Sequence, residues 1–127
     1  MTGSPITVNH TNNLREVKDI FDSNDIHHLP VVSGEKLIGL LSKTDIERIS
    51  FVSDASSDHM TTQIYDVLSI EQVMTKDLTT FQEDQTIKEA AETLATGRFH
   101  ALPILSKEKV VGIVTTTDLL NYLLEQY

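Results

Sequence analysis

Apolar residues recur along the chain with the period of a strand in some segments and with the period of a helix in others. The same order of these segments occurs twice. Each time a short β-prone segment comes first, and apolar residues then recur at the spacing of an amphipathic helix. Asn13 with Glu16, and Thr86 with Glu89, have the spacing of a capping box and mark the two helix starts. The β-prone segments are residues 6–8 and 79–81, and the helices are predicted to stop at Asn24 and Gly97.

Two apolar runs follow each helix, and their continuity predicts buried strands that form a hairpin. Pro30 and Pro103 fall at strand starts, where a missing N–H does least harm. A second helix is predicted after Ser42 and after Thr115, so the order is β-α-β-β-α, twice. The predicted strands are residues 29–33 with 36–41, and 102–106 with 109–114.

The segment between the two copies has its own pattern. Residues 53–58 are polar and are predicted to form a loop. The apolar residues between positions 64 and 73 predict a helix that leads into the second copy. We expect no counterpart to that helix in the first copy.

The two copies align without a gap when the chain is shifted by 73 positions, with 13 identities between residues 1–46 and 74–119. Chance does not hold one register over that length, so the sequence indicates an internal repeat. A unit of about fifty residues buries too little surface to be stable alone. We therefore expect the copies to pack around a pseudo-twofold axis, with boundaries at residues 1–58 and 59–127.

Composition excludes several classes of protein. The 127 residues are 39% hydrophobic and 23% charged, as in a globular protein, and contain no cysteine for disulfides or thiolate zinc sites. The formal charge of −9 disfavours nucleic acid and anionic membranes as partners. Neither a signal-peptide pattern nor an apolar run of membrane-spanning length is present. We expect a cytoplasmic protein.

The start of each second helix carries candidate chemistry, in Ser42-Lys43-Thr44-Asp45 and in Thr115-Thr116-Thr117-Asp118. A helix N-terminus presents unpaired N–H groups that suit phosphate. An ionised aspartate can accept two hydroxyl donors, as the vicinal hydroxyls of ribose require. The same spacing is also that of a capping box, so helix capping alone is the alternative interpretation.

No catalytic or metal-binding pattern stands out. Adjacent His27 and His28 precede a strand and point to opposite sides, so they cannot chelate a metal as a pair. A packing or loop role is the simpler interpretation of these histidines and of His100. The sequence has no glycine-rich phosphate loop, nucleophile elbow or zinc signature. We expect neither catalytic residues nor metal ligands.

These repeated residues resemble the CBS domain family, and the tandem arrangement resembles a CBS pair, or Bateman module. The resemblance covers about residues 1–125 and rests on Met-Thr before a Thr-containing strand, His-x-Leu-Pro, and Gly-x-x-Ser/Thr-x-x-Asp in both copies. It implies an α+β fold of two β-α-β-β-α repeats with two clefts between them. It also implies a homodimeric regulatory module that is not an enzyme, and that senses a ligand for a regulated protein partner.

The resemblance further implies an adenosine-containing ligand, such as AMP, ADP, ATP or S-adenosylmethionine, with no required cofactor. In the family, the aspartate holds ribose and the neighbouring hydroxyls contact ribose or phosphate. His28 stands where many members have arginine, whereas the second copy has Ala101, which weakens a polyphosphate grip there. The expected nucleotide-binding residues are Thr7, His27, His28, Ser42, Lys43, Thr44, Asp45, Thr80, Arg98, Phe99, His100, Ala101, Thr115, Thr117 and Asp118.

Two alternatives stay open at this point. Thr7 and Thr80 also suit an ordinary strand, and Phe99 suits a plain core position. The whole module could instead be a ligand-free dimerisation or docking module for a partner protein. The few cations near the expected sites favour a mono- or diphosphate, or an uncharged adenosine tail, over ATP.

Overall fold

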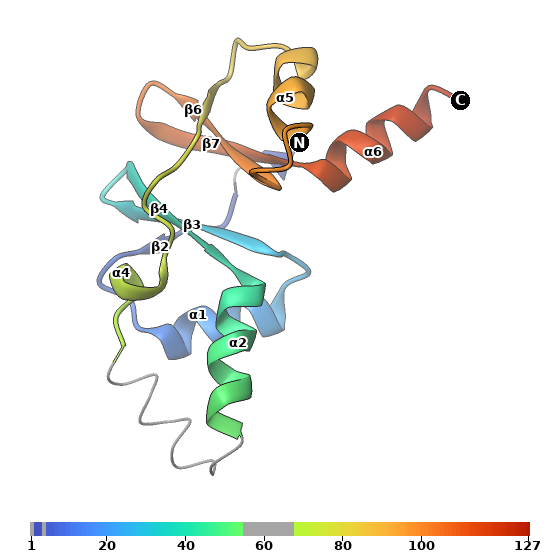
Figure 1. Cartoon of the computed structure of the whole chain (residues 1–127). Coiled ribbons are helices and arrows are strands. Elements are labelled where there is room, and N and C mark those ends of the chain that lie inside the picture. Colours follow the sequence, from blue (N-terminus) through green and yellow to red (C-terminus); the bar gives the residue numbers. More distant parts are fainter. Residues whose placement is uncertain (1, 4, 55–67) are drawn as a thin grey trace. The chain divides into compact units, whose positions relative to one another are not determined.

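The computed structural model describes residues 2–3, 5–54 and 68–127, which form two compact units (Figure 1). Unit 1 comprises Met1–Pro5, Glu35–Leu37 and Leu78–Tyr127, and unit 2 comprises Ile6–Gly34 and Ile38–Asp77. Each unit therefore consists mainly of one repeat; unit 1 also includes two short segments of the first repeat, and unit 2 also includes the chain up to Asp77. The expected boundary between residues 58 and 59 lies outside the described residues and stays a prediction.

Unit 2 contains three neighbouring strands in the order β2-β3-β4. The short strand β2 runs parallel to β3, with Val8 opposite Val31. The elements of this unit are β2 (Val8–Asn9), α1 (Leu14–Ser23), β3 (His28–Ser33), β4 (Lys36–Ser42), α2 (Lys43–Asp54) and α4 (Ile70–Val73), although the first two residues of β4 belong to unit 1.

The core of unit 2 draws on all of these elements. Helix α1 begins where predicted, because the Asn13 side chain accepts a hydrogen bond of 2.8 Å from the Glu16 N–H. Leu14 and Val17 on its apolar face are fully buried, and Ile70 of α4 packs into the same cluster with no exposed surface. Each such aliphatic side chain contributes about 1.5–3 kcal/mol by leaving water.

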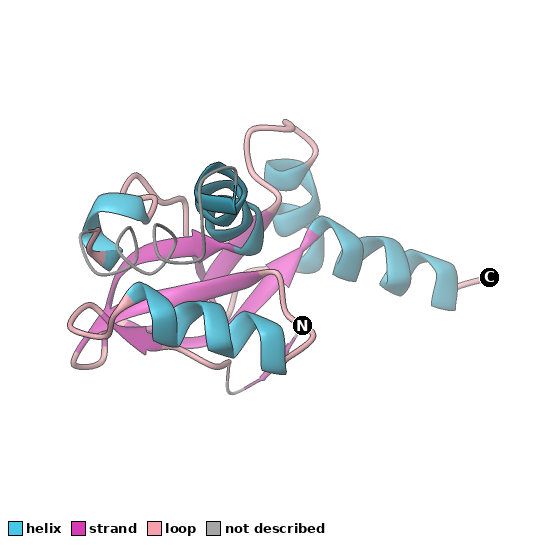
Figure 2. Cartoon of the chain, turned by 90° about the horizontal axis from the view of Figure 1, so that it is seen from below, coloured by secondary structure: helices cyan, strands magenta, loops and turns pink. Residues whose placement is uncertain are grey.

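Unit 1 repeats the arrangement, with strands in the order β5-β6-β7. Phe81 lies opposite Ile104 in parallel strands, which is the pairing of Val8 with Val31 shifted by 73 positions. Helix α6 continues directly from β7 and extends away from its end (Figure 2). The elements are β5 (Phe81–Gln82), α5 (Ile87–Leu94), β6 (Ala101–Ser106), β7 (Lys109–Thr115) and α6 (Thr116–Glu125).

The segments that begin the two repeats, Thr2–Gly3 and Thr75, are exchanged, because each pairs with a strand of the other repeat. Strand β1 (Thr2–Gly3) pairs antiparallel with β7 of the second repeat, with Thr2 opposite Ile113. In unit 2, Thr75 forms a bridge with Leu40, and each N–H donates to the other's carbonyl at 2.9 and 3.0 Å. The second pairing equals the first shifted by 73 positions. The repeated pattern is therefore confirmed in three dimensions, although hydrophobic periodicity predicted neither pairing.

Gly39 lies close to the Met74 side chain. A Cβ atom at Gly39 would overlap the Met74 sulfur and lie 2.8 Å from its Cγ. A glycine inside a buried strand often marks such a close approach.

The α+β fold of two β-α-β-β-α repeats is confirmed, with corrections at element ends. Strands β2 and β5 begin at Val8 and Phe81, two residues later than expected, since only these residues pair with the neighbouring strand. Helix α2 reaches Asp54, so the first two residues of the expected 53–58 loop are helical. Of the described residues in the helix expected between 64 and 73, only those of α4 are helical. Leu68 and Ser69 are not, because Ser69 caps the start of α4. No helix within the described ranges is long and apolar enough to cross a membrane.

Candidate functional site

In unit 2 the N-terminus of α2 lies beside the start of β3. The Lys43 N–H donates to the His27 carbonyl at 2.8 Å, which joins the two segments through the backbone. Ser42 caps the helix by accepting a 3.1 Å hydrogen bond from the Asp45 N–H. The Asp45 carboxylate, 31% exposed, lies 3.7 Å from the Arg48 guanidinium. It is therefore accessible to a ligand and already has a cationic neighbour.

Unit 1 places the corresponding residues in the same relation. The Thr116 N–H donates to the His100 carbonyl at 3.0 Å. Thr115 and Asp118 form a reciprocal capping box: Thr115 Oγ1 accepts from the Asp118 N–H at 3.0 Å, and Asp118 Oδ2 accepts from the Thr115 N–H at 2.9 Å. The capping role is thus confirmed. A carboxylate has about four acceptor positions, so capping leaves capacity for ligand hydroxyls.

Strand topology brings the other candidates to the same end of each sheet. Ala101 of β6 lies opposite Thr115 of β7, and Thr80 directly precedes β5, which runs parallel to β6. These three positions therefore share one end of the unit 1 strands. The corresponding residues in unit 2 are His28, Ser42 and Thr7. The sequence motifs gather into one polar cluster per unit, which we call the half-site.

The remaining candidates differ in exposure. Phe99 is half-buried and packs against the unit 1 core, which favours the core role that the sequence left open for it. Ala101 is buried, while Lys43 and His28 are half-buried. Exposed candidates are Thr7, His27, Thr44, Arg98, His100 and Thr117.

Thr116 is a residue of this cluster that sequence reasoning did not select. Its Oγ1 atom is buried and has no hydrogen-bond partner among the residues that the structure describes. A buried hydroxyl without a partner loses the hydrogen bonds it had with water. The Ser/Thr-x-x-Asp spacing points to Thr115 and Thr117 instead, so only burial could have singled out Thr116.

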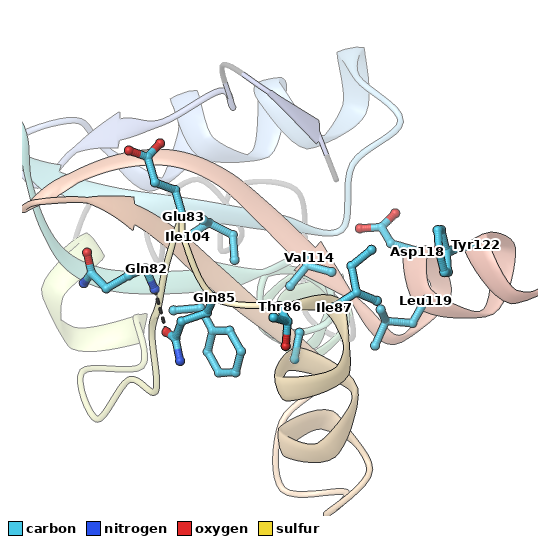
Figure 3. A pocket seen from close by; sticks show the side chains of 12 residues that line it. Gln82, Glu83, Gln85, Thr86, Ile87, Ile104, Val114, Asp118, Leu119 and Tyr122 are labelled. Carbon is cyan, nitrogen blue, oxygen red and sulfur yellow. Dashed lines mark hydrogen bonds between the residues drawn. The ribbon is translucent and has the colours of Figure 1, made fainter.

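A groove in unit 1 is the second feature that the sequence did not predict. It lies between α5, α6 and the strands and has a volume of about 130 Å³ (Figure 3). Small-molecule sites usually enclose about 300–1,000 Å³, so this groove is smaller than a usual ligand site. Asp118 is the one expected site residue that lines it. The lining residues are Phe81, Gln82, Glu83, Gln85, Thr86, Ile87, Ala90, Ile104, Val114, Asp118, Leu119 and Tyr122.

Metal binding finds no support in the described ranges. No group of three histidine, aspartate or glutamate side chains there is placed to hold an ion. Structural and catalytic metal sites need at least three such ligands.

Comparison with known proteins places these features in a family. The model of the CBS domain family matches residues 1–51 and 70–125. The chain therefore belongs to the CBS domain family, and its two matched segments make it a tandem CBS pair.

Relatives differ in what surrounds the pair. An uncharacterized protein of Methanocaldococcus jannaschii is 31% identical over 113 residues, which is 86% of this chain and 40% of that protein. A homoserine O-acetyltransferase of Methanohalobium evestigatum is 31% identical over 124 residues, 95% of this chain and 22% of the enzyme. The chain thus spans less than half the length of these relatives.

Among solved structures, the CBS domain pair of protein MJ0100 has a TM-score of 0.76 and 25% identity. The match covers 96% of this chain and 93% of the other. That crystal structure is a complex with 5'-methylthioadenosine and S-adenosyl-L-methionine. The fold of this chain is therefore that of a CBS pair.

Proposed function

We propose that this CBS pair is a regulatory module that binds an adenosine-containing ligand and is not itself an enzyme. The observation that carries the proposal is the half-site, which repeats with the same backbone bond in both units. It sets an aspartate and hydroxyl side chains at a helix N-terminus, beside the start of a strand. The similar MJ0100 pair binds two adenosine compounds, which supports the same ligand class.

The proposed roles follow from the chemistry of each group. Asp45 and Asp118 accept hydrogen bonds from ribose hydroxyls. The helix N-termini meet phosphate with their N–H groups, assisted by Lys43, His28 or Arg98. Thr7 and Thr80 face the adenine edge in this proposal. The hydroxyl residues that contact ribose or phosphate are Ser42, Thr44, Thr115 and Thr117.

Signalling requires that the ligand bind one arrangement of the module better than another. A ligand with equal affinity for both would shift nothing, however tightly it bound. We propose that this differential binding is transmitted to a partner protein or an attached domain. The few cations in the half-sites favour a mono- or diphosphate, or an adenosine without phosphate, over ATP.

A thermal-shift screen with AMP, ADP, ATP and S-adenosylmethionine tests the ligand class. A ligand at one hundred times its Kd raises the free energy of unfolding by about 2.7 kcal/mol. We expect such a rise with at least one compound, and no turnover of ATP in the presence of Mg²⁺. No shift at millimolar concentration with any of them would favour a docking module that works without a ligand.

Substitution of the aspartates tests the half-sites. Asp45→Asn and Asp118→Asn remove the charge, and the second keeps an oxygen that can accept from the Thr115 N–H. Each should weaken ligand binding about tenfold to a hundredfold, the value of a charged hydrogen bond. Asp19→Asn, at an exposed position of α1, is the matched control and should bind normally. Unchanged affinity in both single variants and in the double variant would contradict the ribose assignment.

We also propose that the module forms a homodimer. Helix α6 and the residues after it expose Leu120, Leu123, Leu124 and Tyr127, which recur at helical spacing along one stripe. An exposed apolar stripe of this kind is typical of a protein interface. Light scattering should give twice the monomer mass of 14.2 kDa, and Leu123→Glu should lower it to the monomer value.

A further inference from the structure

The first residue of the second helix differs between the two half-sites. In unit 2 it is Lys43, a half-buried cation, and in unit 1 it is Thr116. The backbone holds both residues in the same way, because their N–H groups donate to the carbonyls of His27 and His100 at 2.8 and 3.0 Å. A lysine and a threonine side chain therefore start from equivalent points of two otherwise similar half-sites.

The first residue of the neighbouring strand differs in the same sense. His28 of β3 is half-buried, and its equivalent 73 positions later is Ala101 of β6, which is buried. A pair that differs in the opposite sense is Asp25 of unit 2 and Arg98 of unit 1. Both are exposed and lie in loops, three residues ahead of their strands. Water and salt screen charges at such positions more strongly than a half-buried charge, so Lys43 and His28 make the unit 2 half-site the more cationic one.

The carboxylates of the two half-sites also have different neighbours. Asp45 lies 3.7 Å from the Arg48 guanidinium, whereas the residue equivalent to Arg48 in unit 1 is Asn121, which carries no charge. A cation beside Asp45 offsets the repulsion between that carboxylate and a phosphate group. Asp118 has no cation at the equivalent position, so its charge opposes a phosphate nearby.

The Thr116 side chain has an unused capacity for hydrogen bonding. Its Oγ1 atom is buried and has no partner among the residues that the structure describes. The residue as a whole is only half-buried, and threonine in a helix occupies two staggered χ1 rotamers, so the hydroxyl can reach a second position by rotation. An uncharged ligand atom that bonded this hydroxyl would remove the cost of leaving it unpaired.

We infer that the two half-sites select different adenosine compounds: unit 2 takes one that carries a phosphate group, and unit 1 takes one without phosphate. Lys43 and Thr116 are the residues that determine this specificity. Lys43 gives the phosphate a charged hydrogen bond beside the N–H groups of the helix N-terminus, and Thr116 bonds an uncharged oxygen or nitrogen of the ligand. The inference rests on the proposed function and adds to it a separate ligand class for each unit.

AMP and adenosine are matched probes, since they differ only in the phosphate. Each would be titrated into the full chain, with the backbone amide NMR signals of Asp45 and Asp118 reporting on their own half-sites. At the unit 2 half-site we expect AMP to bind about tenfold more tightly than adenosine, the lower value of a charged hydrogen bond. At the unit 1 half-site, adenosine should bind at least as tightly as AMP.

Lys43→Thr and Thr116→Lys exchange the two determinants. Lys43→Thr should weaken AMP binding in unit 2 about tenfold and change adenosine binding there by less than about twofold, because adenosine has no phosphate to contact. Thr116→Lys should give the unit 1 half-site a preference for AMP over adenosine. Lys88→Thr removes an exposed lysine of α5 and is the matched control for net charge. It should leave every affinity nearly unchanged, because exposed charges contribute little.

Thr116→Val tests the hydroxyl without adding a charge or much volume. It should weaken adenosine binding in unit 1 about threefold to tenfold, the value of a neutral hydrogen bond, while circular dichroism shows a folded chain. This variant keeps the inference testable even if Thr116→Lys does not fold. Unchanged adenosine binding in folded Thr116→Val would overturn the role of Thr116.

The remaining outcomes separate the inference from the proposed function. The same preference between AMP and adenosine in both half-sites, or an equal effect of Lys43→Thr on both compounds, would overturn the inference and leave the proposed function standing. If AMP, adenosine, ATP and S-adenosylmethionine all failed to move either amide signal, the proposed function would fail and the inference with it.

Discussion

Ile70→Ala is the sharpest test of how unit 2 is held together. Ile70 has no exposed surface, and its four-residue helix is capped by a reciprocal box between Ser69 and Gln72. The substitution removes three carbon atoms from the core. At about 0.8 kcal/mol for each buried methylene, the transfer part of the loss is about 2.4 kcal/mol. A residual cavity adds to this, so we expect the free energy of unfolding to fall by about 3 kcal/mol, within the usual range for such truncations.

Urea denaturation followed by circular dichroism measures this loss. The midpoint should fall while the slope stays constant, because a change in slope would mean an altered unfolded state or an intermediate. Ile87→Ala is the control, since Ile87 is 51% exposed and occupies the equivalent of a core position in the other unit. It should lose less than about 1 kcal/mol, as partial burial implies. Equal losses in the two variants, or a loss below about 1 kcal/mol for Ile70→Ala, would refute the assignment of the loss to the buried position of Ile70.

Two further predictions concern the backbone. Gly39→Ala should lower stability by about 1–3 kcal/mol, because the added methyl meets the Met74 side chain. Met74→Ala in the same chain should make the Gly39→Ala loss smaller, as a double-mutant cycle by urea denaturation would show, and full additivity would contradict the contact. Lys107→Gly should raise stability by about 1 kcal/mol, since Lys107 has a φ of 60° whereas its equivalent, Gly34, has a φ of 65°. Gly34→Lys should lower the melting temperature, and opposite signs would contradict the strain.

Local signals explain why so much of each repeat was predictable. Asn13 and Thr86 cap their helices as their spacing indicated, because capping depends on residues three positions apart. The strand pairs 28–33 with 36–42 and 101–106 with 109–115 agree with the apolar runs to within a residue. The exchange of Met-Thr segments escaped prediction because Thr2 and Ile113 are distant in sequence. Periodicity carries no information about which distant strand a short segment joins.

Of the candidate sites, the half-sites could be predicted from local sequence, whereas the groove and the buried Thr116 hydroxyl could not. Ser/Thr-x-x-Asp marks the half-sites because a helix start and its capping residues are local. The groove in unit 1 depends instead on how α5, α6 and the strands pack together in three dimensions, which no local pattern of residues states. Similarly, the buried Thr116 hydroxyl becomes visible only when the surrounding strands and helix are in place.

The exchanged strands impose an order on the folding of a nascent chain. Nearly all of unit 2 precedes the second repeat in the chain, so this unit can fold before unit 1 is complete. Strand β1 precedes unit 2, whereas its partner β7 follows it. The edge of β1 therefore stays unpaired until both repeats have been made, and its pairing with β7 belongs to a late step of assembly.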